Sequence, residues 1–163
     1  MIGALAQKSW ITYYKDKDLS IAFDDVVRVE DVIVEPYLGK KERKALLKKP
    51  YRLSNGVWTR VEYKDEIPYT FFIPTGYRWN GANVPFGLYH LVGAPSDPRF
   101  KVASMVHDFL CENKFVIDGN RYLSSRIFKG LLKEAGVGGF KRFLMFHAVD
   151  NYQKFCGWNK RKY

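Results

Sequence analysis

Cysteine and long apolar runs are what this 163-residue chain has least of. Only Cys111 and Cys156 occur, and a secreted domain held together by disulfides needs more. We therefore expect two reduced, buried thiols that act as small apolar side chains. No run approaches the roughly 18–20 apolar residues of a membrane-spanning helix. The apolar opening residues 1–6 have no basic leader before them, so we expect no signal peptide and synthesis in the cytoplasm.

The residues that are present suit one folded domain. Hydrophobic residues make up 47% of the chain and aromatic residues 17%, which is not the composition of a disordered protein. We expect a single α+β domain over 1–163, in which a small antiparallel sheet packs against about three helices. Its parts are a β-rich region at 1–74, an ordered loop rich in glycine and proline at 75–98, a helical region at 99–157 and a basic tail at 158–163.

Local patterns place the elements of that domain. Segments rich in β-branched and aromatic residues predict strands at 8–14, 26–34 and 69–73. Asn55-Gly56 predicts a hairpin turn that joins 51–54 to the alternating segment 57–63.

Helical signals follow the same logic. A short helix is predicted at 40–49, where Pro50 stops it. Longer helices are predicted from about Pro98 to Asn113, from Arg121 to Ala135 and from Gly139 to Phe155. Gly136 has the place of a glycine that ends the second of these.

The charge is strongly basic and uneven. Residues 1–35 carry a net charge of −3, while the remaining residues carry +13. A local basic insertion at 38–52 holds seven cations: Lys40, Lys41, Arg43, Lys44, Lys48, Lys49 and Arg52. Such a field favours anionic partners, namely nucleic acid or acidic proteins. A solvated helix surface is the alternative interpretation of the same residues.

One helix carries the most suggestive polar residues. His107 and Asp108 are adjacent, so they point about 100° apart and can border one cleft from two sides. Asp108 shares its face with Glu112, and the two carboxylates can supply oxygens to a divalent cation such as calcium. His107 has the chemistry of a general base. The structural alternative is a histidine bound to backbone and an exposed acidic pair.

The loop before that helix is a second candidate. Its small residues, Gly81 among them, allow backbone to approach a ligand closely. Asn80 and Asn83 can stabilise tight turns in its wall. The alternative is a packed loop in which Trp79 is buried.

Several motifs in one order carry a resemblance to a known family. They are Thr-Gly-Tyr-Arg-Trp-Asn-Gly-Ala-Asn-Val-Pro at 75–85, Met-Val-His-Asp-Phe-Leu at 105–110, Ser-Arg-Ile-Phe at 125–128, Ala-Gly-Val at 135–137 and Leu-Met-Phe-His-Ala-Val at 144–149. Over roughly residues 70–157 the chain resembles an uncharacterised family of tailed bacteriophages and prophages. That family has a Gly-Phe-x-Thr-Asp-Gly-Ala-Ser-Val-Pro loop, a His-Asp-Trp-Leu-Tyr helix, an Ala-Asp-x-x-Phe motif and a Met-rich last helix. The His-Asp helix is also similar to that of phospholipases A2.

Three of this chain's departures from the family pattern bear on the site's chemistry. The family's loop Asp is Asn80 here, its Tyr after the His-Asp pair is Cys111, and its Asp on the next helix is Ser125. Two of the three acids that the resemblance implies for holding a cation or orienting the histidine are therefore neutral. Asp150 is the candidate replacement.

The resemblance and the charge together predict a non-enzymatic bacteriophage protein. We expect a virion component, tail or capsid-associated, or an assembly protein, whose basic face contacts nucleic acid or acidic subunits of other phage structural proteins. This interpretation needs no cofactor and is compatible with a homo-oligomer. The alternative is a metal-assisted hydrolase of an envelope ester or amide. In it, His107 is the base, Asp108 and Glu112 bind the cation, and Asn80, Gly81 and Asn83 form the substrate-side wall.

Overall fold

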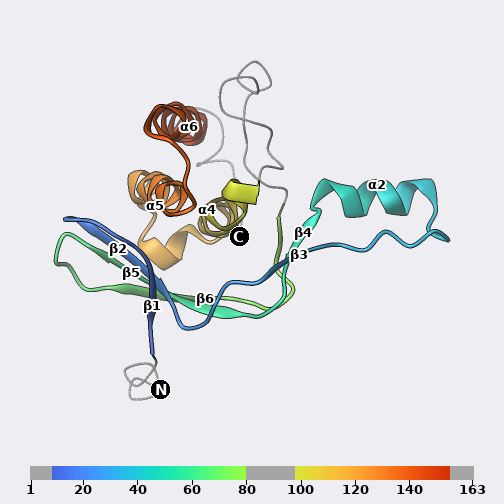
Figure 1. The fold of residues 1–163 in the computed structure, drawn as a ribbon, viewed down its shortest axis with the longest axis horizontal. Coiled ribbons are helices and arrows are strands. Elements are labelled where there is room, and N and C mark those ends of the chain that lie inside the picture. Colours follow the sequence, from blue (N-terminus) through green and yellow to red (C-terminus); the bar gives the residue numbers. More distant parts are fainter. Residues whose placement is uncertain (1–8, 80–97, 155–163) are drawn as a thin grey trace.

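The computed structural model describes residues 9–79 and 98–154 (Figure 1). Its strands are β1 (Ile11–Lys15), β2 (Leu19–Phe23), β3 (Val29–Asp31), β4 (Tyr51–Leu53), β5 (Val57–Tyr63), β6 (Tyr69–Ile73) and β7 (Arg78–Trp79). Its helices are α2 (Lys40–Lys48), α4 (Lys101–Glu112), α5 (Arg121–Glu134) and α6 (Gly139–Tyr152), with 3₁₀ turns η2 (Pro98–Phe100) and η3 (Lys114–Ile117). The predicted α+β class is confirmed, with strands first and the three long helices after them.

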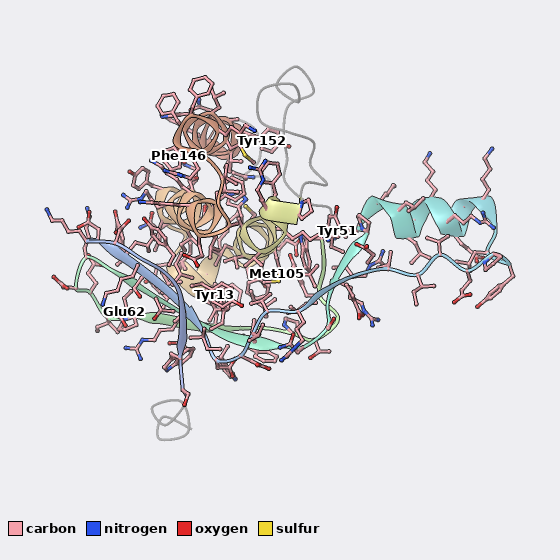
Figure 2. The ribbon with its side chains drawn as sticks, in the orientation of Figure 1. Tyr13, Tyr51, Glu62, Met105, Phe146 and Tyr152 are labelled. Carbon is pink, nitrogen blue, oxygen red and sulfur yellow. The ribbon has the colours of Figure 1, made fainter. Side chains whose placement is uncertain are left out.

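The strands form two sheets. The larger one is antiparallel in the order β1-β2-β5-β6, and the smaller one has the order β3-β4-β7. Val57, Thr59 and Val61 alternate inward along β5 and are fully buried. Figure 1 shows α4, α5 and α6 stacked on one side of the larger sheet. The core lies between these two layers, where the side chain of Met105 also points (Figure 2).

The hairpin predicted around Asn55-Gly56 is wrong. Segments 51–54 and 57–63 are joined by this turn but do not pair with each other. The first contributes β4 to the smaller sheet, whereas the second contributes β5 to the larger one. The turn therefore moves the chain from one sheet to the other.

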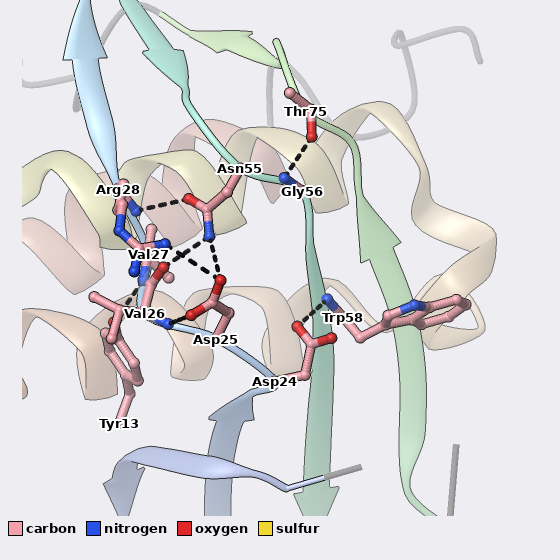
Figure 3. A network of polar contacts seen from close by, with 10 residues as sticks. All are labelled: Tyr13, Asp24, Asp25, Val26, Val27, Arg28, Asn55, Gly56, Trp58 and Thr75. Carbon is pink, nitrogen blue, oxygen red and sulfur yellow. Dashed lines mark hydrogen bonds and ion pairs between the residues drawn. The ribbon is translucent and has the colours of Figure 1, made fainter. Parts of the chain in front are cut away.

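Side-chain contacts explain this change of sheet (Figure 3). Asn55 donates from Nδ2 to Asp25 Oδ2 at 3.1 Å and to the Val26 carbonyl at 2.9 Å. The backbone N–H of Gly56 donates to Thr75 Oγ1 at 2.6 Å. These partners tie the turn to the connection between β2 and β3 and to the end of β6, so β5 pairs with β2 and β6 instead.

The sequence patterns did not predict strand β2. The strand predicted at 26–34 is shorter in the structure, where it covers only Val29–Asp31. Leu19, Ile21, Ala22 and Phe23 are all buried. A strand that is buried on nearly every residue lacks the alternation by which a half-exposed strand is recognised.

The helical region matches its local signals. The side chain of Asn120 accepts from the Leu123 N–H at 3.0 Å and caps the start of α5. Gly136 follows α5 with φ +92°, the left-handed geometry that favours glycine. Cys111 is buried and forms no disulfide among the described residues, as expected, whereas Cys156 lies outside them. Among the described residues, no helix is both long and apolar enough to cross a membrane.

Candidate functional site

His107 lies inside the protein on α4. Its side chain is only 5% exposed, and its ring centroid lies 5.3 Å from that of Phe128 on α5. The Sγ of Cys111, one turn later, is 3.8 Å from the ring nitrogens. An apolar ring on one side and a thiol on the other hold the imidazole in place.

A small pocket joins His107 to α6. His107, Asp108 and Ser104 line it from α4, and Gln153 lines it from the end of the chain's described part. Its volume of about 20 Å³ suits one water molecule. The buried Oε1 of Gln153 has no hydrogen-bond donor among the described residues, so it is an acceptor for such a water. His107 and Asp108 thus line one small pocket, and their roles as base and cation ligand stay predictions.

Glu112 points to a different partner. Tyr77, which precedes β7, donates its hydroxyl to Glu112 Oε2 at 3.1 Å. Burial raises the pKa of Tyr77 far above its ordinary value, and the negative charges of Glu112 and Asp108 raise it further. Both carboxylates therefore disfavour ionisation of the Tyr77 hydroxyl. The described residues contain no group of three or more His, Cys, Asp and Glu side chains that could hold a metal ion.

Asp150 of α6 forms a polar cluster with two residues of α5. It is ion-paired with Arg121, and its Oδ1 accepts from the Ser125 hydroxyl at 2.8 Å. The carboxylate on α6 thus contacts the position at which the resembling family has its own Asp. These contacts with Arg121 and Ser125 give Asp150 a role in joining α5 to α6.

Part of the candidate loop lies outside the described residues, namely Asn80, Gly81 and Asn83. Trp79, the residue before them, is buried with 1% exposure, and its Nε1 donates to Ser104 Oγ at 3.1 Å. The start of the loop is thereby attached to the same helix that carries His107.

The basic insertion forms a projecting segment, which we name the basic arm (residues 32–50). Figure 1 shows α2 away from α4–α6, where it projects beyond the smaller sheet at one end of the molecule's long axis. Helix α2 has no buried residue. The arm carries six cations and two acids, together with exposed apolar side chains at Ile33, Tyr37 and Leu47, which are 75%, 82% and 59% exposed.

The cations of this region have two kinds of environment. Arg43 donates to the carbonyls of Leu38 at 3.1 Å and Pro36 at 2.5 Å, and Arg52 is ion-paired with Glu30. The five lysines have no ion pair within the described chain and are all exposed: Lys40, Lys41, Lys44, Lys48 and Lys49. The two arginines therefore hold the arm together, while the lysines face solvent.

Arg78 was missed by sequence reasoning. Its guanidinium donates to the carbonyls of Leu46 at 2.8 Å and Lys49 at 2.8 Å and 3.1 Å. A cation at the carbonyl end of a helix satisfies orphan acceptors and complements the helix dipole. The sequence signal was only that Arg78 precedes Trp79 in a short strand, and nothing local connects it to a helix thirty residues earlier.

Comparison with known proteins identifies the family. Residues 56–149 match the family described as "Protein of unknown function (DUF1353)", which is more than half of the chain. The chain belongs to the DUF1353 family. The matched region runs from the turn before β5 almost to the end of α6, so the DUF1353 region contains His107 and Asp108, whereas the basic arm precedes it.

One curated relative shares part of this DUF1353 chain. The uncharacterized protein y4jT of Sinorhizobium fredii (strain NBRC 101917 / NGR234) is 32% identical over 80 residues, which is 49% of this chain. The similar segment spans 23% of that relative's length. No solved structure matches the chain.

Proposed function

We propose that this DUF1353 protein is a non-enzymatic, phage-encoded binding protein of the virion or its assembly, and that its basic arm binds nucleic acid. One observation supports the proposal above the others: α2 buries none of its residues and exposes four lysines that have no ion pair within the described residues. A nine-residue helix that buries no residue is marginal in water. Contact with a partner would stabilise such a helix.

The chemistry of the arm fits phosphate groups. Lysines at intervals along one short helix neutralise successive phosphates without reading sequence. Tyr37, Ile33 and Leu47 add exposed apolar and aromatic surface beside them, which suits contact with sugars and bases. The phage context rests on the motif resemblance at 75–85 and 105–110.

Fluorescence anisotropy with a labelled 20-base-pair DNA tests the arm. We expect binding that weakens steeply with salt, and a double variant Lys44→Gln/Lys48→Gln whose log–log salt slope is flatter by about 2, since each lost phosphate contact removes about 0.9. The matched control Lys15→Gln/Lys64→Gln removes the same charge from exposed lysines on the larger sheet and its loop. Binding that does not change with salt, or equal losses in both variants, contradicts the proposal. If the partner is instead an acidic protein, the wild-type chain should show no DNA binding in this assay.

Mass spectrometry of purified phage particles tests the virion part. Peptides of this chain at a fixed ratio to the capsid protein are the expected result. Their absence from particles made by a host that expresses the chain would contradict a virion role.

A metal-assisted hydrolase is the second candidate, and one observation favours it: His107 and Asp108 line the same pocket. Calorimetric titration of the chelator-treated protein with calcium, magnesium, manganese and zinc separates the two functions. The hydrolase requires tight binding of one metal that Asp108→Asn abolishes. No binding in the wild-type protein would leave the pair a structural role.

A further inference from the structure

A second concentration of positive charge surrounds a cavity between β1, α5 and α6. The cavity has a volume of about 290 Å³. Its polar lining consists of Tyr14, Asp16, Arg126, Lys129, Lys133 and Arg142. In Figure 1 these elements lie at the opposite end of the long axis from α2, so this site is separate from the basic arm.

Helix geometry brings the cations together. Arg126, Lys129 and Lys133 are spaced by three and four residues on α5, which places them on one face. Arg142 joins them from the first turn of α6. Like charges four residues apart, such as Lys129 and Lys133, destabilise a helix by a few tenths of a kcal/mol, so this stripe is not explained by helix stability.

The single carboxylate in the lining already has partners. Asp16 accepts from the Tyr14 hydroxyl at 2.5 Å and from the backbone N–H groups of Asp18 and Leu19 at 2.8 Å. Its Oδ2 lies 3.5 Å from Arg126. Lys129, Lys133 and Arg142 have no ion pair with any acid in the described chain. Lys129 lies over the ring of Phe146 at 5.2 Å from its centroid, and no carboxylate of the described chain neutralises the three cations.

Arg142 adds an unsatisfied donor. One of its terminal nitrogens donates to the Val137 carbonyl at 2.5 Å. Its Nε is buried and has no acceptor among the described residues. A buried donor of a charged group without an acceptor is uncommon in native proteins, and it leaves part of the hydrogen-bonding capacity of Arg142 unused.

Gly130 allows the ring of Tyr14 to form the remaining wall of the cavity. A side-chain carbon at Gly130 would stand 2.7 Å from Cδ2 of Tyr14, closer than two carbon atoms can pack. The ring of Tyr14 therefore lies directly on the α5 backbone between Lys129 and Lys133. This contact brings the β1 side of the cavity against its cationic stripe.

We propose that this cavity binds the phosphate groups of a small phosphorylated molecule. Guanidinium groups match phosphate oxygens with paired hydrogen bonds, and lysine ammonium groups add compact charge. The volume lies at the lower end of the range for ligand pockets, so a compound of one or two phosphates fits better than a larger ligand. The proposal does not depend on the function of the basic arm.

Calorimetric titration of the full chain with inorganic pyrophosphate tests this site. The wild-type chain binds one equivalent, and Lys129→Gln/Lys133→Gln weakens binding at least tenfold, as expected for loss of two charge-assisted contacts. The matched control Lys15→Gln/Lys64→Gln removes two exposed lysines that do not line the cavity and leaves pyrophosphate affinity unchanged. If the double variant loses its helical circular dichroism, Lys133→Gln alone, at an exposed position, gives the same comparison with a smaller loss.

Competition identifies the source of the phosphate. Displacement of pyrophosphate by a short DNA duplex assigns the cavity to backbone phosphates, and displacement only by mononucleotides assigns it to free phosphorylated compounds. No binding of pyrophosphate by the wild-type chain, or an equal loss in both double variants, overturns the site. Because the arm and the cavity are tested with different ligands and different pairs of lysines, failure of the arm and failure of the cavity give different patterns.

Discussion

The basic arm and the α5–α6 region use positive charge in different ways. The lysines of α2 stand on a helix with no buried residue, and their charge faces solvent. The lysines of α5 share their helix with fully buried Leu123, Ile127 and Leu132, and their charge lines a cavity. The first arrangement suits an extended partner that is reached from outside, and the second suits a small ligand.

The two regions also differ in how they are held. The arm depends on hydrogen bonds from arginine to carbonyls: Arg43 within the arm and Arg78 at the end of α2. The α5–α6 region depends on apolar packing, supported by the Arg121–Asp150 ion pair. The arm also precedes residues 56–149, which the family match covers. Charge in the arm can therefore be changed with little effect on the folded body.

The largest expected difference comes from matched leucine truncations. Leu132→Ala removes a fully buried side chain on α5 and should lower the free energy of unfolding by about 2–5 kcal/mol. Leu47→Ala acts on a side chain of α2 that is 59% exposed and should change it by less than about 0.5 kcal/mol. Urea unfolding followed by circular dichroism measures both. Similar losses in the two variants would show that the arm packs on the body in solution.

Ion pairs should show the same contrast with smaller effects. The side chains of Arg121 and Asp150 are 25% and 17% exposed, and Asp150 also accepts from Ser125. Asp150→Asn should therefore lower the free energy of unfolding by about 1–3 kcal/mol. The Arg52–Glu30 pair at the base of the arm is about half exposed, so Glu30→Gln should leave stability within measurement error. A larger loss for Glu30→Gln would reverse the comparison.

Sequence reasoning reached the elements that are encoded locally. Helix α2 ends where Pro50 requires, and Asn120 and Gly136 bound α5 as their residue types predict. The pairing of the strands could not be predicted in this way, because the direction of the turn at Asn55 depends on its contact with Asp25, thirty residues earlier. Local patterns do not contain such contacts.

The candidate sites divide in the same way. Helical spacing correctly placed His107 and Asp108 on one pocket, since both stand on one helix. The cavity at α5 was missed because its wall combines Tyr14 with Arg142, which are far apart in sequence. The spacing of Arg126, Lys129 and Lys133 was visible, but a basic stripe on a helix is most often a solvated face, and only the position of Tyr14 shows that it lines a cavity.

The smallest effect concerns the cavity wall at high pH. Burial raises the pKa of Tyr14 from 10.0 to about 12, assisted by its hydrogen bond to Asp16 and by the charge of that carboxylate. A raised pKa in the folded state means that the contribution of Tyr14 to stability is complete below pH 10 and is lost as the pH rises to about 12. The difference in unfolding free energy between the wild-type chain and Tyr14→Phe should therefore shrink across this interval. Absorbance at 295 nm should show one phenol that titrates near pH 12 in the wild-type chain and is missing from the variant. Asp16→Asn removes the negative charge and should move this titration toward pH 10, and an unchanged titration would contradict the hydrogen bond that closes the cavity.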